Sequence, residues 1–168
     1  AFWRWIATWG AVVRTPADLG HDDTSYRLLS LRMHDVVVDV DHRAAWASGT
    51  LFAVNAVSLS DQRATRRGTL DARVAKAAEI ASGDEPCIVW CELNDESTAL
   101  VNVIPGAVEV KGSDDSDDKA EKLAAFSRGD VRVIVTKPSI AGFGLNWQHC
   151  AQMVFVGASH SYEQTYQA

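Results

Sequence analysis

The chain has 168 residues, of which 47% are hydrophobic, and its formal net charge of −6 gives an isoelectric point near 5.3. This length predicts one compact domain, and the acidic balance argues against a free-standing nucleic-acid binder, although not against a fragment whose basic groove is completed by another domain. Three cysteines without a signal-peptide pattern favour a reducing, cytoplasmic setting. No apolar run reaches the roughly 20 residues of a membrane span, so we expect no membrane association.

The first thirty residues predict a helix and a linker. Apolar side chains at helical spacing favour an amphipathic helix that packs on its own chain, with a partner surface as the alternative: Phe2, Trp5, Ile6, Trp9, Val12 and Val13. Pro16 and Gly20 bound one short helical turn. We therefore place an N-terminal helix and linker at 1–30 and the compact domain at 31–168.

Strands alternate with helices in the rest of the chain. The pattern predicts strands at 35–40, 87–91, 107–111, 131–136 and 152–157, and helices at 61–82, 95–103, 117–128 and from 161 onward. The stretch with Trp46, Leu51, Phe52 and Val57 is ambiguous. This order predicts an α/β fold, doubly wound around a mostly parallel sheet with helices on both faces. Ligands bind at the carboxyl ends of the strands in such folds.

An acidic run, GSDDSDDKAEK, occupies residues 112–122. Its aspartates precede a predicted helix, where negative charge is favoured by the helix dipole and by unpaired backbone N–H groups. A calcium loop would need a glycine at its sixth position and a glutamate at its twelfth, and the run lacks this pattern. We predict a solvated helix cap.

Three familiar site motifs fail against this sequence. A dinucleotide-binding loop would need a glycine at position 147, which is Trp147. A P-loop would need a Gly-Lys-Ser/Thr triplet, which the chain does not contain. The segment GASHS could place Ser159 on a nucleophile elbow, but Ser161 stands where that motif has glycine, and the adjacent His160 cannot fold back as the base.

The cysteines do not have metal-ligand spacing. Cys87 and Cys91 lie four residues apart on one predicted strand, so about 13 Å separates their Cα atoms, too far for a shared zinc ion. We predict that both are small buried hydrophobic residues. His149 and Cys150 have no second pair of ligands nearby in the sequence, which favours a structural role.

The segment VIVTKPSIAGFGLNWQHCAQMVFVGASHSYEQTYQA, residues 133–168, resembles motif V and the start of motif VI of superfamily 2 helicases, closest to the Swi/Snf-type and phage-type DEAD/DEAH branches. CIVWC with its following helix resembles motif IV, and VKGSDD resembles the segment between these motifs. The resemblance covers residues 87–168 well and 31–86 weakly. It implies a second RecA-like domain, truncated at the start of motif VI.

The resemblance assigns residues to two ligands. It implies that Thr136, Gly112 and Ser113 contact nucleic acid, with the Thr136 hydroxyl donating to a phosphate at the exposed end of its strand. It implies a nucleotide-facing set at the cleft between two RecA-like domains: Gly142, Gly144, Asn146 and Gln167. Without the resemblance, the same loop would be a tight turn in which Asn146 satisfies backbone groups. Phe143 and Trp147 are expected to pack this loop down.

The implied function is that of a second motor domain of an ATP-dependent helicase or translocase, with DNA, or alternatively RNA, as its track. ATP and Mg²⁺ would be bound mainly by the first RecA-like domain of the parent chain, and the fragment alone would not turn over ATP, because the motifs for the phosphate cradle and the held metal ion are missing from it. The alternative is a self-contained, non-catalytic doubly wound module that binds a ligand or partner through the same loop.

Overall fold

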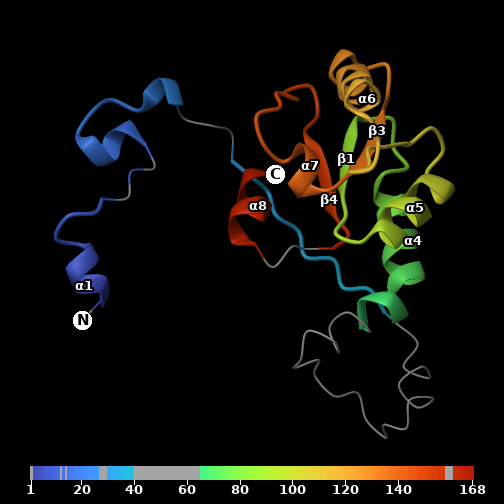
Figure 1. The fold of residues 1–168 in the computed structure, drawn as a ribbon, viewed down its shortest axis with the longest axis horizontal. Coiled ribbons are helices and arrows are strands. Elements are labelled where there is room, and N and C mark those ends of the chain that lie inside the picture. The colour runs from blue at the N-terminus through green and yellow to red at the C-terminus, as the bar shows by residue number, and fades with distance from the viewer. Residues whose placement is uncertain (1, 12, 14, 27–29, 40–64, 158–160) are drawn as a thin grey trace, which may run out of the picture. The chain divides into compact units, whose positions relative to one another are not determined.

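The computed structural model describes residues 2–11, 13, 15–26, 30–39, 65–157 and 161–168 (Figure 1). The chain divides into two compact units, Ala1–Val36 and Val37–Ala168, each of which is described by itself. The ambiguous stretch around Trp46 lies outside the described residues, as do the first four residues of the helix predicted at 61–82. Ser159 and His160 of the rejected nucleophile motif also lie outside them.

The described residues of the first unit form three short helical segments: α1 (Phe2–Ile6), η1 (Pro16–Leu19) and η2 (Thr24–Tyr26). Gly20 closes η1 in the left-handed conformation, as its position after the predicted turn indicates. The observed helix α1 ends at Ile6 and is therefore shorter than the apolar stripe, which the sequence extends to Val13. Trp5 and Trp9 contact each other edge to face at 5.3 Å and are 59% and 65% exposed, so these two side chains are not buried within the first unit, and packing of the stripe on the rest of the chain stays a prediction.

In the described part of the second unit, a four-stranded, all-parallel sheet forms the centre, with strand order β2-β3-β1-β4. The strands are β1 (Cys87–Trp90), β2 (Val108–Glu109), β3 (Val133–Thr136) and β4 (Gln152–Phe155). The central pair aligns Cys87 with Val133 and Trp90 with Thr136. Both central strands are buried along their whole length, which is why they read as continuous apolar runs in the sequence.

Helices α4 (Leu70–Ile80) and α5 (Asn94–Val103) cover one face of the sheet and lie beside each other (Figure 1). Alternate residues of the central strands point to this face. One buried cluster joins both helices to the sheet through Val74, Ala77, Leu100, Cys87, Val89, Val133 and Val135. Period-two alternation thus divides each buried strand between two cores.

The opposite face packs against α6 (Ser116–Arg128) and the short helix α7 (Pro138–Ala141). Phe126 of α6 is fully buried against Ile88, Trp90 and Ile134. Burial of such a side chain is worth about 1.5–3 kcal/mol. Helices on both faces of a parallel sheet confirm the α/β fold class predicted from the sequence.

The acidic run forms a helix cap, as predicted. The Asp115 carboxylate accepts hydrogen bonds from the backbone N–H groups of Asp117 and Asp118 at 2.9 and 3.0 Å, at the start of α6. Gly129 ends this helix with a φ of 82°, a conformation that costs little only for glycine. Both ends of α6 are therefore encoded locally.

Two local predictions differ from the structure. Residues 35–39 form no strand, and Val37 is 89% exposed, because β-branched residues favour extended backbone but a strand also needs a hydrogen-bonded neighbour. The loop expected directly after β3 begins instead with α7, in which Pro138 occupies the first turn. The last helix, α8 (Tyr162–Gln167), starts at the cap residue Ser161. Among the described residues, no helix is long and apolar enough to span a membrane.

Candidate functional site

A pocket of about 370 Å³ lies at the carboxyl ends of three adjacent strands of the second unit. We call it the strand-end pocket. Its lining comes from the segments that follow β1, β2 and β3: Asn94, Thr98, Lys111, Gly112, Ser113, Lys137, Ser139 and Ile140. This is the edge at which parallel α/β folds bind their ligands.

The polar lining of the strand-end pocket suits an anion. The lining contains two lysines, Lys111 and Lys137, of which Lys111 also pairs with Glu109, and three hydroxyl residues, Thr98, Ser113 and Ser139. Among the described residues that line it, none has an aromatic or acidic side chain. The pocket can therefore hold phosphate-like groups by charge and hydrogen bonding, without base stacking.

Lys111 is connected to α5 through Glu109 and Ser97. Its ammonium group pairs with one oxygen of the Glu109 carboxylate at 3.0 Å, and the buried Ser97 hydroxyl donates to the other oxygen at 2.5 Å. Ser97 belongs to the first turn of α5, which also carries Asn94 and Thr98. A short polar chain thus connects α5 to the lysine on the neighbouring strand end.

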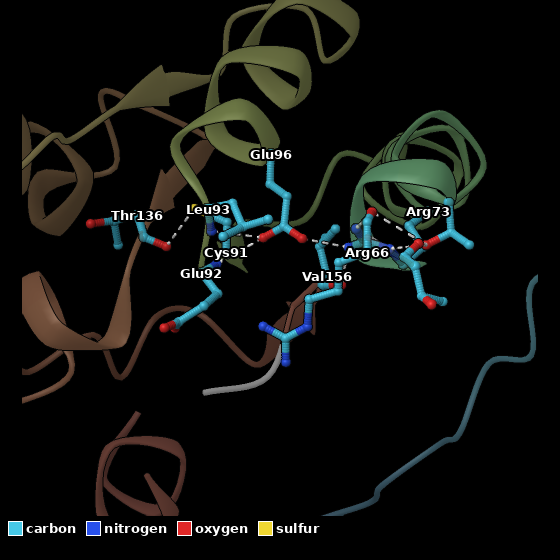
Figure 2. Close-up of polar contacts among 10 residues, drawn as sticks. Arg66, Arg73, Cys91, Glu92, Leu93, Glu96, Thr136 and Val156 are labelled. Atoms are coloured by element: carbon cyan, nitrogen blue, oxygen red, sulfur yellow. Dashed lines mark hydrogen bonds and ion pairs between the residues drawn. The ribbon is translucent and has the colours of Figure 1, made fainter. Parts of the chain in front are cut away.

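A buried ion pair lies beside this turn of α5 (Figure 2). Glu96 is fully buried, and its carboxylate pairs with the Arg73 guanidinium of α4 at 2.7 Å. The second Glu96 oxygen accepts hydrogen bonds from the backbone N–H groups of Glu92 and Leu93 at 2.9 and 3.0 Å. Burial by itself raises the pKa of Glu96, but these two donors and Arg73 outweigh it and hold the pKa below its usual range.

Arg73 also reaches three other groups. It donates to the carbonyl oxygen of Val156, just after β4, and to that of Arg66, each at 2.6 Å, and to the hydroxyl of Thr69 at 3.1 Å. Together with Glu96, it ties the end of β1, the start of α5 and the end of β4 to α4. We call the pair Arg73–Glu96 the buried hub.

Thr136 does not lie where the sequence analysis places it. Its side chain is fully buried, and its hydroxyl donates to the carbonyl oxygen of Val110 at 3.2 Å. The expectation of an exposed hydroxyl at the strand end is therefore wrong, because the buried hydroxyl bonds to Val110, the residue after β2. Gly112 and Ser113, by contrast, line the strand-end pocket.

The four residues assigned to the nucleotide do not line this pocket. Gly144 has a φ of 75°, whereas Gly142 has a right-handed helical backbone and is needed for space, since a Cβ atom there would lie 2.4 Å from the Pro138 carbonyl oxygen. Asn146 and Gln167 are exposed. The structure leaves the nucleotide assignment of this set as a prediction.

Aromatic packing holds the loop that carries these residues. Trp147 packs edge to face on Phe126 at 5.1 Å and donates its indole N–H to Ser127 at 2.9 Å. Phe143 is 52% exposed, so only Trp147 packs the loop down as predicted. The buried indole nitrogen of Trp90, near Trp147, has no hydrogen-bond partner among the described residues.

The cysteines behave as buried hydrophobic residues. Burial raises the pKa of Cys87 to about 11 and that of Cys91 to about 12. Both side chains are fully buried and neither forms a disulfide. Within the described ranges, no group of three His, Cys, Asp or Glu side chains is placed to hold a metal ion.

Sequence reasoning missed most of the strand-end pocket. Lys137 directly follows β3, and Lys111 lies two residues after the end of the adjacent strand β2; this position near strand ends was the available signal. Asn94 and Thr98 share one face of a helix start, which the sequence places in a helix but not at a site. The buried hub leaves no comparable trace, because an arginine and a glutamate 23 residues apart read as ordinary surface charges.

Comparison with solved structures finds helicase and ATPase domains. The chain is similar to the Pyrococcus furiosus Hef helicase domain, with a TM-score of 0.49, 21% identity and coverage of 57% of this chain and 22% of that chain. It is also similar to the C-terminal part of the Fun30 ATPase domain, with a TM-score of 0.48, 17% identity and coverage of 60% of this chain and 34% of that one. The chain thus spans well under half of either structure. No family model and no curated protein matches the sequence.

Proposed function

We propose that the second unit is the second RecA-like domain of an ATP-dependent helicase or translocase and that its strand-end pocket binds the phosphodiester backbone of a nucleic-acid strand. The observation that carries the proposal is that Lys111 and Lys137, near the ends of adjacent strands, line the same pocket together with several hydroxyl side chains. Ammonium and hydroxyl donors hold phosphates irrespective of base sequence. The resemblance of residues 87–168 to motifs IV and V supports the same ligand.

The proposal reassigns the phosphate contact predicted from motif V. Thr136 points into the core, so the neighbouring residues Lys137 and Ser139 take the role of contacting the strand. Gly112 and Ser113 keep the role assigned to them.

In this proposal, DNA is the track and RNA an alternative one. The nucleotide would be ATP with Mg²⁺, held mainly by a first RecA-like domain of the parent chain, while Gly142, Gly144, Asn146 and Gln167 would face it from this side. Within the part of the chain that the structure describes, no group of three His, Cys, Asp or Glu side chains could hold a metal ion, so we assign no Mg²⁺ ligand to these residues. We expect no ATP turnover from this chain by itself, measured with and without single-stranded DNA. Turnover that copurifies with the protein would contradict the motor-domain proposal.

Titration of the full chain with an oligothymidylate of about 20 nucleotides tests the pocket directly. Two lysine contacts predict a slope of log K against log salt of about −1.4 for a single strand. Lys111→Ala or Lys137→Ala should each weaken binding about fivefold and reduce the steepness of the slope by about 0.7. Lys76→Ala is the matched control, since this lysine pairs with Glu79 on the surface of α4 and does not line the pocket.

The possible outcomes separate the two functional classes. Equal binding by the wild type and both pocket variants would refute the pocket as the nucleic-acid site. Binding of inorganic phosphate or ATP, lost in the pocket variants, together with no oligonucleotide binding would favour the self-contained ligand-binding module.

A further inference from the structure

We propose that Glu96 is a positioning residue of the strand-end pocket, and that Gly157 is glycine in order to leave room for the Glu96 carboxylate. This inference rests on the proposed function of the pocket, whose lining does not include either residue. It assigns a role in ligand binding to a buried charge that neither the sequence motifs nor the resemblance singles out.

The first step is the contact between Glu96 and the loop before α5. One carboxylate oxygen accepts the backbone N–H groups of both Glu92 and Leu93, the two residues that immediately precede Asn94 of the pocket (Figure 2). Thr98 lies four residues after Asn94 and therefore on the same side of the helix. Glu96 thus fixes the conformation of the segment that supplies one wall of the pocket.

The turn that contains Glu96 is also connected to Lys111, which lines another wall of the pocket. Ser97, its neighbour on the first turn of α5, donates to Glu109, which in turn pairs with Lys111. A shift of this turn would move the hydroxyl that orients Glu109. The position of Lys111 therefore depends on the same turn that Glu96 holds.

Glu96 is also held by Arg73 of α4, on the side away from the pocket loop. The other carboxylate oxygen of Glu96 pairs with Arg73, which also bonds to the carbonyl oxygen of Val156 after β4. The buried hub thereby fixes the start of α5 relative to α4 and to the sheet. An anion pocket next to a buried carboxylate also needs this neutralisation, since an unpaired charge on Glu96 would repel a phosphate.

Gly157 provides an independent way to displace the carboxylate. A Cβ atom at this position would lie 2.6 Å from one Glu96 oxygen and 3.0 Å from the other, well inside normal contact. The carboxylate cannot move aside without losing its bonds to Arg73, Glu92 and Leu93. Gly157→Ala therefore pushes on Glu96 without changing any charge or any lining residue of the pocket.

The test compares Glu96→Gln and Gly157→Ala with the wild type, in the full chain and well below each melting temperature, using the same oligothymidylate. Gln can supply only one carbonyl acceptor, so at least one of the bonds to Arg73 or to the backbone donors is lost. We expect both variants to bind about three- to tenfold more weakly and to show a salt slope about 0.7 shallower, as expected when one lysine contact is displaced. Hydrogen exchange in the peptide 91–98 should become faster in both variants.

A matched glycine control distinguishes positioning from a general loss of stability. Gly83→Ala adds the same methyl group at a site where no atom of the described residues lies within 4 Å, and it should bind as the wild type does. A purely structural role for Glu96 would lower the melting temperature of Glu96→Gln and Gly157→Ala but leave affinity and salt slope unchanged, and this result would overturn the inference. An equal loss of binding in Gly83→Ala would do the same.

Failure of this inference and failure of the proposed function give different results. If Lys111→Ala weakens binding while Glu96→Gln and Gly157→Ala bind normally, only the positioning role is wrong. If neither lysine variant differs from the wild type, or if the wild type does not bind the oligonucleotide, the proposed function fails and this inference fails with it.

Discussion

Replacing Arg73 by methionine should destabilise the second unit more than any change to a surface charge. The substitution keeps much of the apolar stem but removes the partner of a fully buried carboxylate, together with the bonds to Val156, Arg66 and Thr69. Breaking a buried ion pair by removing one partner costs about 3–5 kcal/mol. Because the Arg73 side chain is 17% exposed, we expect the lower end, about 3 kcal/mol.

Urea denaturation followed by far-ultraviolet circular dichroism measures this loss. With a slope of about 2 kcal/mol per molar urea, the midpoint should fall by about 1.5 M. Lys76→Met on the same helix is the control: its ion pair with Glu79 is 2.7 Å long but has exposed fractions of 37% and 67%, so its loss should cost less than about 1 kcal/mol. Equal midpoint shifts for Arg73→Met and Lys76→Met would refute the reasoning that burial makes the hub strong.

A double-mutant cycle extends the test. In the background of Glu96→Gln, the carboxylate charge is already gone, so Arg73→Met should cost less than it does in the wild type. A coupling energy of about 1–3 kcal/mol is expected for two residues in direct contact within one network. Strict additivity would mean that Arg73 stabilises the fold through its other bonds and not through Glu96.

Three further outcomes follow from the geometry. Folding lowers the pKa of Glu96, so its contribution to the stability of the fold should be complete above the unfolded value of about 4.3 and should be lost as pH falls through the folded pKa. The urea midpoints at pH 7 and pH 3 should therefore differ less in Glu96→Gln than in the wild type. An equal change of midpoint with pH in the two proteins would contradict this. Thr136→Val should cost about 1 kcal/mol of stability, measured in urea, and leave oligothymidylate affinity unchanged; weaker binding by the folded variant would restore the phosphate role. Cys87 and Cys91 should resist iodoacetamide at pH 8 in the folded chain and react in urea, as read by mass spectrometry, whereas rapid labelling without urea would show that this core opens.

Local sequence patterns predicted much of the second unit because several of its signals act within a few residues. The apolar runs at Cys87–Trp90 and Val133–Thr136 form the two central strands. Asp115 and Gly129 mark the ends of α6 through a side-chain cap and a left-handed backbone, both of which depend on neighbouring residues alone. Residues 35–39 also have a local strand signal, their run of valines, but a strand needs a hydrogen-bonded neighbouring strand as well, and the prediction of a strand there was wrong.

The candidate site was predicted only in part for a related reason. Gly112 and Ser113 were assigned to nucleic acid through their place between two motifs, and they line the strand-end pocket. Thr136 was expected to be exposed because it ends a strand, but whether a strand end is exposed depends on the neighbouring segments, and here the Thr136 hydroxyl bonds to Val110, just after β2. The pairing of β2 with β3 was not visible in the alternation of elements.

The amino-acid sequence by itself determined the fold class, the order of strands and helices after residue 86 except for the short helix α7, and the caps of α6, because hydrophobic periodicity and capping are properties of short segments. Tertiary structure alone decided which strand ends adjoin, and hence that Lys111 and Lys137 share one pocket. It also decided that Glu96 pairs with Arg73 in the buried hub and is not a surface charge. The physical reason is that burial and charge pairing depend on contacts between residues distant in the chain, and no local pattern specifies those contacts.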